Sequence, residues 1–389
     1  MIEDTFSIYI HFPWCVKKCY YCDFNSHAIN KKIPEQQYIA RLLIDFDASL
    51  QFLSRSGKTR LTSIFFGGGT PSLLSAKSIA IILNHINKIF AFPRDLEITL
   101  EVNPGAVEQD SMYGYKTSGI TRVSVGAQSF QDDKLKILGR VHKSCDIKTT
   151  LDNIIKTKFN SFNIDLMYGL PNQNINDALY DLNLALSFSP PHLSWYQLTM
   201  EQNTWFYHCP PVLPDEDIIW EIYNAGLNIL ANKNYINYEI SAFAKENYFC
   251  RHNLNYWQYG DYLGIGPGAH SKITNFKQKN VTQNVMEINR LIKIKNPKEY
   301  LDSLNNSAIS SCNIITKKDI IFEFMLNNLR LQQGFLKEDF LKKTSCQLND
   351  IQPGLNIAIS KNLLEIDGNN IKPTLLGRRF LNNLQELFV

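Results

Sequence analysis

Residues 8–22 read IYIHFPWCVKKCYYC and contain the most informative feature of the chain. Cys15, Cys19 and Cys22 follow a strand-like apolar run, with three residues in the first gap and two in the second. Three closely spaced thiolates can hold three corners of a [4Fe–4S] cluster, whereas an electron-transfer cluster is normally closed by four cysteines. The spacing therefore predicts a cluster with one iron free to bind a small molecule.

A zinc site is the main alternative for these cysteines. His11, Asp23 or His27 could complete it, because zinc accepts nitrogen, oxygen and sulfur ligands. Three structural cysteines are a further alternative. The position of the cysteines after the first expected strand, within a repeating β–α pattern, favours the cluster.

The composition is that of an ordinary globular protein. With 389 residues, 44% of them hydrophobic and 20% charged, the chain can bury a large core. A net charge of +3 does not indicate a nucleic-acid partner. No signal peptide or long apolar segment is evident, so we expect a cytoplasmic chain with reduced thiols. Peripheral contact with the inner membrane and formation of a homodimer are both left open.

Six strand-like runs alternate with helical patterns over the first 200 residues. The expected strands are Phe6–Phe12, Ser63–Phe66, Glu97–Val102, Arg122–Ala127, Asn163–Tyr168 and Leu193–Leu198. The expected helices cover residues 35–54, 75–90, 108–117, 146–158 and 176–188, with Ser75 and Asn176 as N-caps. This alternation predicts an α/β fold, a partial (β/α)6-type barrel whose ligands gather at the C-terminal strand ends.

The last 75 or so residues follow a different pattern. Helices are expected at 317–330, 336–343 and 351–361, then a hairpin of Leu363–Ile366 and Ile371–Thr374, and a last helix at 375–387. Helices followed by a hairpin predict a small winged-helix-like module. No stripe of lysine and arginine marks it, so we expect a packing or docking role. The predicted domains are a barrel core (1–200), a barrel extension (201–305) and the module (306–389).

Polar and glycine-rich segments lie near the ends of the expected strands. The segment Gly67–Thr70 (GGGT) lets the backbone approach a ligand closely and offers N–H groups, although a plain glycine turn would look the same. Four further polar residues lie near successive strand ends: Glu101, Gln128, Arg140 and Asp165. Each alone is equally an ordinary loop residue. As a set around one barrel mouth they predict a binding site.

A histidine with aromatic neighbours lies farther along the chain, where residues 250–257 read CRHNLNYW. His252 could ligate haem iron through one imidazole nitrogen, with the aromatic residues covering the macrocycle. The alternative is a hydrogen-bonded core histidine beside packing aromatics, and the residues alone favour it. His270 follows the glycine-rich stretch GIGPG and is expected in a strand-end loop.

Together these motifs resemble the radical S-adenosylmethionine (SAM) superfamily. More specifically, they resemble its oxygen-independent coproporphyrinogen III oxidase group and the haem chaperones within that group. The segments that carry the resemblance are residues 11–15 (HFPWC), 22–27 (CDFNSH), 67–71 (GGGTP), 101–104 (EVNP), 126–130 (GAQSF), 165–171 (DLMYGLP), 252–257 (HNLNYW), 261–266 (DYLGIG) and 377–379 (GRR). The resemblance covers nearly the whole chain.

The resemblance implies roles for individual residues. Cys15, Cys19 and Cys22 would ligate the [4Fe–4S] cluster, and SAM would occupy the free iron. The other residues that would contact SAM are Tyr9 near the adenine, Gly68 with Gly69 and Thr70 near the amine, Glu101 at a polar group, and Gln128, Arg140 and Asp165 at positions that contact a second SAM in the oxidase. The residues that match the HNxxYW motif of the haem chaperones, and would bind haem, are His252, Asn253, Tyr256 and Trp257.

Two departures from the oxidase favour the chaperone. The oxidase carries a further cysteine two residues after the third, where this chain has Phe24, and only 14 residues precede Cys15. We therefore expect a haem chaperone that hands haem to an acceptor such as a respiratory enzyme. The competing hypothesis is a radical SAM oxidative decarboxylase of coproporphyrinogen III, and a weaker one is a nucleic-acid-binding protein.

Overall fold

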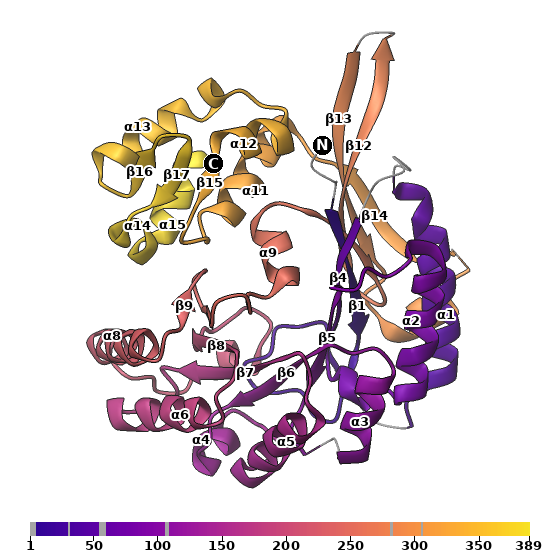
Figure 1. Cartoon of the computed structure of the whole chain (residues 1–389), viewed down its shortest axis with the longest axis vertical. Helices are drawn as coiled ribbons and strands as arrows, with labels where there is room; N and C mark the ends of the chain where they lie inside the picture. Colours follow the sequence, from indigo (N-terminus) through magenta and orange to yellow (C-terminus); the bar gives the residue numbers. More distant parts are fainter. Residues whose placement is uncertain (1–4, 30–31, 54–59, 106–108, 281–282, 305) are drawn as a thin grey trace.

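The computed structural model describes residues 5–29, 32–53, 60–105, 109–280, 283–304 and 306–389. Its main feature is a twelve-stranded sheet in the order β14-β13-β12-β11-β1-β4-β5-β6-β7-β8-β10-β9 (Figure 1). The strands are β1 (Thr5–Phe12), β4 (Arg60–Gly68), β5 (Glu97–Val102), β6 (Arg122–Gln128), β7 (Ser161–Tyr168), β8 (His192–Gln197), β9 (Ile236–Asn237), β10 (Ala242–Ala244), β11 (Asp261–Ile265), β12 (His270–Asn280), β13 (Gln283–Lys293) and β14 (Ile309–Ile314).

The centre of this sheet is parallel. Strands β11, β1, β4, β5, β6, β7 and β8 pair in parallel with their neighbours, whereas the strands added at the two ends pair antiparallel. In the described part of the chain, β14 and β9 form the two edges of the sheet. The predicted α/β fold with an open, partial barrel is therefore confirmed.

Helices cover the outer side of the curved sheet (Figure 1). They are α1 (Glu35–Ser49), α2 (Ala76–Phe90), α3 (Gln109–Thr117), α4 (Asp132–Ile137), α5 (Ser144–Thr157), α6 (Ile175–Ser187) and α8 (Glu216–Asn232). Shorter helices are α7 (Trp205–His208), α9 (Arg251–Trp257) and α10 (Pro297–Asp302). Within the described ranges, no helix has both the length and the apolar character needed to cross a membrane.

All six expected strands and the five helices expected before residue 200 are present, with ends within a few residues of those predicted. Ser75 caps α2 as expected, because its side chain accepts a hydrogen bond from the Ser78 N–H at 3.2 Å. The predicted cap Asn176 is wrong. Asn174 caps α6 instead, accepting from the Asp177 N–H at 2.9 Å while the Asp177 carboxylate accepts from the Asn174 N–H.

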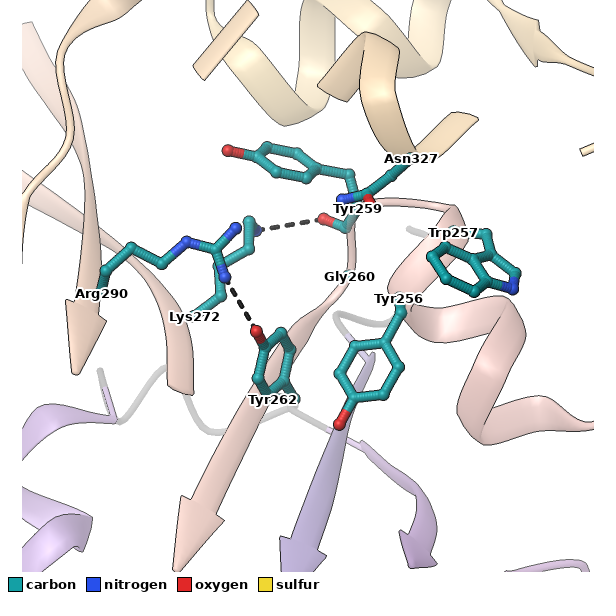
Figure 2. Close-up of a pocket in the computed structure, with 8 residues that line it drawn as sticks. All are labelled: Tyr256, Trp257, Tyr259, Gly260, Tyr262, Lys272, Arg290 and Asn327. Atoms are coloured by element: carbon teal, nitrogen blue, oxygen red, sulfur yellow. Dashed lines mark hydrogen bonds between the residues drawn. The ribbon is translucent and has the colours of Figure 1, made fainter. Parts of the chain in front are cut away.

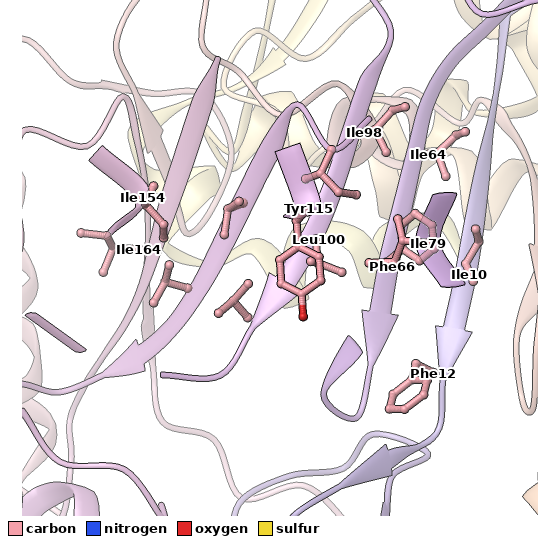
Figure 3. Packing of buried hydrophobic residues seen from close by; sticks show 14 of the residues in the cluster. Ile10, Phe12, Ile64, Phe66, Ile79, Ile98, Leu100, Tyr115, Ile154 and Ile164 are labelled. Atoms are coloured by element: carbon pink, nitrogen blue, oxygen red, sulfur yellow. The ribbon is translucent and has the colours of Figure 1, made fainter. Parts of the chain in front are cut away.

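The main core lies between the sheet and the outer helices (Figure 3). Strand residues such as Ile10, Phe66 and Leu100 are fully buried there, and Ile79 of α2 and Ile154 of α5 pack in the same cluster. β-branched and aromatic side chains suit such buried parallel strands. Burying this apolar surface is the main favourable term that holds the layers together.

The chain between residues 200 and 315 contains strands that the sequence did not reveal. β11 returns to the centre of the sheet and pairs in parallel with β1, with Tyr9 opposite Gly264. β12 and β13 form a long hairpin that projects beyond the body of the molecule (Figure 1). The return of β11 places the segment that begins with α9 beside the N-terminal strand. The predicted domain boundaries at residues 200 and 305 stay predictions.

The C-terminal residues form a separate small core beside the sheet. Its elements are α11 (Lys317–Asn328), β15 (Phe335–Leu336), α12 (Lys337–Thr344), α13 (Gln352–Ser360), β16 (Leu364–Asp367), β17 (Asn370–Pro373), α14 (Leu375–Arg379) and α15 (Leu381–Gln385). Three helices (α11, α12 and α13) followed by the hairpin of β16 and β17, with β15 added to that sheet, match the expected winged-helix-like arrangement. The single last helix predicted at 375–387 is wrong, because α14 ends before Phe380 and α15 starts after it.

A buried ion pair joins three distant parts of the fold. Lys293 of β13 donates to the Asp45 carboxylate of α1, and neither side chain is exposed. The other Asp45 oxygen accepts from the Gly266 N–H at 3.0 Å and from the Tyr300 hydroxyl at 2.8 Å. Gly266 has φ of +97°, and a Cβ there would lie 2.4 Å from the carbonyl oxygen of His11. The pair thus fixes the loop after β11 against the end of β1.

Removing one partner of this pair should destabilise the protein strongly. Lys293→Ala leaves the Asp45 carboxylate buried without its cation, so we expect the free energy of unfolding to fall by about 3–5 kcal/mol. Denaturant unfolding followed by circular dichroism measures this. Lys148→Ala, on the exposed side of α5, is the control and should change stability by no more than about 0.5 kcal/mol. Equal midpoints for the two variants would contradict the assigned role.

Candidate functional site

The three cysteines lie on a loop that begins where β1 ends. Cys15 is buried in the short strand β2 (Trp14–Cys15), which pairs in parallel with β3 (His27–Ala28), and Cys19 and Cys22 are half-buried on the loop between them. The neighbouring loops hold it in place, because the Tyr20 N–H donates to the Leu138 carbonyl at 3.1 Å and its own carbonyl accepts from Phe206. All three thiols are free.

Three cysteine sulfurs are donors of the kind that hold an iron–sulfur cluster. No three His, Cys, Asp or Glu side chains among the described residues are grouped as a single metal ion would require. In a cubane, each cysteine binds a different iron, so its sulfurs stand farther apart than the ligands of one ion. Burial, together with the neighbouring Cys22, raises the pKa of Cys15 to about 11, so the free thiol keeps its proton at neutral pH. A bound metal would displace that proton, because a cysteine ligates metal as the thiolate.

Arg140 places a half-buried positive charge beside this loop. Its Nη1 lies 3.6 Å from the Cys19 sulfur, and its Nη2 donates to the Asn103 side chain and the Gly126 carbonyl, both at 2.6 Å. Burial lowers the pKa of Arg140, but the neighbouring Tyr21 and Cys19 raise it by more, so the pKa lies above its usual value. A permanent cation at this distance offsets the negative charge of a thiolate.

The glycine segment after β4 is bonded to the chain that leads into the cysteine loop. The Gly69 N–H donates to the Phe12 carbonyl at 2.7 Å, and the Thr70 N–H donates to the Trp14 carbonyl at 2.8 Å. Gly68 has φ of +114°, and a Cβ there would lie 2.7 Å from the Phe12 oxygen. Close approach of two backbones therefore requires glycine at Gly68. The N–H groups of Gly69 and Thr70 are already used inside the protein.

Glu101 at the end of β5 faces this segment and accepts from the Gly68 N–H at 3.2 Å. Burial and, to a smaller extent, the charge of Asp165 raise the pKa of Glu101 to about 8, although the Gly68 hydrogen bond acts in the opposite direction. The carboxyl group is thus largely protonated at neutral pH. A cationic ligand beside it would favour the charged form.

A cavity of about 680 Å³ opens next to the cysteine loop. The residues that line it are Tyr9, His11, Lys18, Asp23, Phe24, Asn25, Ser26, His27, Phe65, Gly68, Glu101, His252, Asn253, Tyr256, Tyr262, Gly268, His270 and Lys295. Three of the predicted SAM residues, Tyr9, Gly68 and Glu101, are on this wall. Most of the other lining residues come from the cysteine loop, α9 and the turn between β11 and β12. The sequence predicted a binding role for some of them, such as His252, but not for others, such as Asn25 and Lys295.

The other predicted SAM residues do not line this cavity: Gly69, Thr70, Gln128, Arg140 and Asp165. Gln128 accepts a hydrogen bond from the Tyr196 hydroxyl at 2.7 Å, and Asp165 accepts from Ser124 at 3.2 Å and Asn163 at 2.7 Å. Neither of them, nor Arg140, is among the residues that line the cavity. The four polar residues expected around one barrel mouth are therefore not all in one place. Glu101 lines the cavity, whereas Gln128, Arg140 and Asp165 do not. Its SAM roles stay predictions.

His252 begins the motif on α9 and is held by hydrogen bonds on both ring nitrogens. Its Nδ1 lies 2.8 Å from the Ser63 hydroxyl and its Nε2 lies 3.0 Å from the Tyr256 hydroxyl. The ring stacks on Phe65 with centroids 4.9 Å apart, and only 1% of the residue is exposed. Burial lowers the pKa of His252 to about 3. This geometry is that of a hydrogen-bonded core histidine, which the sequence offered as the alternative to a haem ligand.

The remaining motif residues point to two different places. Asn253 and Tyr256 line the large cavity, whereas Trp257 lines a second pocket of about 300 Å³ (Figure 2). That pocket also contains Tyr256, Tyr259, Gly260, Tyr262, Lys272, Arg290 and Asn327. The Trp257 ring packs against the Arg330 guanidinium at 4.3 Å, at the C-terminal module. Trp257 thus joins α9 to that module, and its role in haem binding stays a prediction.

Comparison with known proteins places the chain among well-described relatives. Residues 9–185 match the radical SAM superfamily, and residues 315–380 match the HemN C-terminal domain. The protein named heme chaperone HemW is 46% identical in Haemophilus influenzae, over 98% of this chain and 97% of the relative. The protein of that name in Escherichia coli is 42% identical over 98% of both chains. In Bacillus subtilis, it is 31% identical over 90% of this chain and 89% of its own.

A solved structure shares the fold. It is described as coproporphyrinogen III oxidase (HemN) from Escherichia coli, a radical SAM enzyme. The TM-score is 0.81 over 99% of this chain and 90% of that chain, with 22% identity. At this identity the likeness concerns the fold alone.

The raised pKa of Glu101 predicts a pH-dependent stability. Its folded pKa, about 8, lies above the unfolded value near ~4.3, so its stabilising contribution is complete below pH ~4.3 and is lost as pH rises through about 8. Glu101→Gln should therefore gain stability over the wild type as pH rises from 5 to 8, by about 1–3 kcal/mol. Thermal unfolding of the metal-free protein across this range measures the difference.

The control is Glu246→Gln, an exposed carboxylate after β10. Its stability difference from the wild type should stay flat over the same pH range. If Glu101→Gln gives an equally flat difference, the carboxyl is charged in the folded protein and the assignment is wrong.

Proposed function

Since this chain belongs to the HemW family within the radical SAM superfamily, we propose that it is a haem chaperone, which binds haem and passes it to an acceptor protein. The observation that carries the proposal is the large cavity. Its wall joins the cysteine loop, three of the predicted SAM residues (Tyr9, Gly68 and Glu101) and α9 in one place. A chaperone needs such a binding site and no reaction of its own on the cargo.

The cofactors are a [4Fe–4S] cluster and SAM, as for the superfamily. We propose that Cys15, Cys19 and Cys22 hold the cluster, since their thiols are free and lie on the loop that supplies part of the cavity wall. A cluster with one iron lacking a protein ligand can bind the amino and carboxylate groups of SAM. On the protein side, Glu101 would accept from the amino group, because a cation beside it favours its charged form.

The cavity offers haem an aromatic and partly basic surface. Phe65, Tyr256 and Tyr262 form its aromatic wall, and Lys18 and Lys295 place ammonium groups on the same cavity. Flat apolar surface suits the macrocycle, and cations suit the two propionates. In this arrangement His252 supports the wall from behind, since it holds the Tyr256 hydroxyl and stacks on Phe65.

We propose a respiratory haem enzyme as the acceptor. We further propose that transfer occurs in the cytoplasm, with contact at the surface of the inner membrane. A homodimer would place two such cavities in one assembly. The C-terminal module is the part we propose for docking, because it packs beside α9 through Arg330 and Trp257.

The competing function is oxidation of coproporphyrinogen III. Phe24 lines the cavity and is 54% exposed where the oxidase would have a further cysteine. We expect the reconstituted protein to bind haem stoichiometrically, and to form no protoporphyrinogen when incubated anaerobically with coproporphyrinogen, reductant and SAM. Difference absorption spectra and chromatography of the tetrapyrroles measure the two results. Efficient turnover of coproporphyrinogen would overturn the chaperone proposal.

The cluster ligands are tested separately. Cys19→Ala removes one of three thiolates, so the broad visible absorbance of the anaerobically reconstituted cluster should be lost. Cys145→Ala, at an exposed position on α5, should keep that absorbance and the iron content of the wild type. An intact [4Fe–4S] spectrum in the Cys19 variant would show that this residue is not a ligand.

A further inference from the structure

Four histidines line the large cavity: His11, His27, His252 and His270. An iron ligand must present a ring nitrogen with a free lone pair. Two of the four have none to offer in this structure. Both nitrogens of His252 are hydrogen-bonded, and those of His11 contact the Tyr9 hydroxyl at 3.0 Å and the Asn25 carbonyl at 2.9 Å.

The other two differ in how strongly they are held. His27 places Nε2 3.2 Å from the Asn25 side-chain oxygen, which leaves Nδ1 without a hydrogen bond among the described residues. His270 makes no side-chain hydrogen bond or ion pair within the described parts of the chain, and its side chain is exposed on the cavity. Its ring is therefore the one that can turn toward a ligand without breaking a contact.

The backbone that carries His270 is fixed although its ring is free. His270 is the first residue of β12 and pairs with Ile292 of β13. A Cβ on Gly264 would lie 2.0 Å from the His270 carbonyl oxygen, so the two backbones are in close contact. Just before it, the Gly268 N–H donates to the Ile294 carbonyl at 2.9 Å. A ligand on such an anchored segment is held at a defined place with little loss of backbone freedom.

The charge around His270 suits a ferric haem with two propionates. Partial burial lowers the pKa of His270, and the neighbouring Lys295 and Arg290 lower it further, so the imidazole is neutral at physiological pH. Neutral imidazole is the form that binds iron. Lys295 and Lys18 line the same cavity, where their ammonium groups would pair with the propionates of a bound macrocycle.

We propose that His270, the first residue of β12, is the protein ligand of the haem iron. This inference rests on the proposed function and assigns the ligand within that cavity. His252 is then a positioning residue that keeps the aromatic wall in place. The iron would bind on the side of the cavity formed by β11, β12 and the cysteine loop.

The test is a haem titration of the full-length protein. His270→Ala should weaken haem binding by about tenfold or more and change the absorption and electron paramagnetic resonance spectra, because an imidazole ligand is lost. Added imidazole should restore the wild-type spectrum in this variant. His252→Gln should weaken haem affinity, because the aromatic wall of the cavity loses a supporting contact. Its haem spectrum should remain that of the wild type, because the iron ligand is still present. His208→Ala, exposed on α7 and away from the cavity, is the control and should match the wild type.

Each other outcome is decisive. An unchanged haem spectrum in His270→Ala overturns the assignment. If only His27→Ala lost the wild-type haem spectrum, His27 would be the ligand instead. A spectral change in His252→Gln but not in His270→Ala also overturns it. If the wild-type protein bound no haem, the proposed function would fall together with the ligand, which distinguishes that failure from a wrong ligand alone.

Discussion

The position of β1 is the constraint on which the rest of the site depends. It is a buried strand with a parallel neighbour on each side, β4 and β11, so three strands end at the same edge of the sheet. The first ends in the cysteine loop, the second in the glycine segment and the third in the turn that leads to His270. Sequence segments more than 200 residues apart are thereby brought to one cavity. The Asp45–Lys293 pair keeps the third strand end at that edge.

Much of the parallel sheet could be predicted because each of its strands has a recognisable local sequence pattern. Each is a short β-branched run between helical patterns, and burial on both faces allows little else. The cysteine spacing is equally local, so the cluster ligands can be proposed from residues 15–22 alone. The strands β11 to β14, between Asp261 and Ile314, could not be predicted. β12 and β13 mix polar and apolar residues without a clear alternation, and their pairing depends on the sheet already being present.

The individual side chains of the site were harder to predict than its outline. Nothing in the sequence shows that Ser63, 189 residues before His252, would take one of its ring nitrogens. A histidine in an aromatic motif therefore looks like a ligand until its partners are known. His270 was noticed only as part of a glycine-rich turn, because an unpartnered ring has no sequence signature. The misplaced N-cap had a simpler cause, since Asn174 and Asn176 differ by two positions in one polar stretch.

Tyr256 and Tyr262 line both the large cavity and the smaller pocket at the C-terminal module, so they form a common partition. Their rings meet edge to face with centroids 4.5 Å apart, and the Tyr262 hydroxyl accepts from Arg290 at 2.8 Å. Because both spaces share these two side chains, a rotation of either tyrosine would change the wall of both. The shape of the large cavity therefore depends on two residues that also face the C-terminal end of the chain.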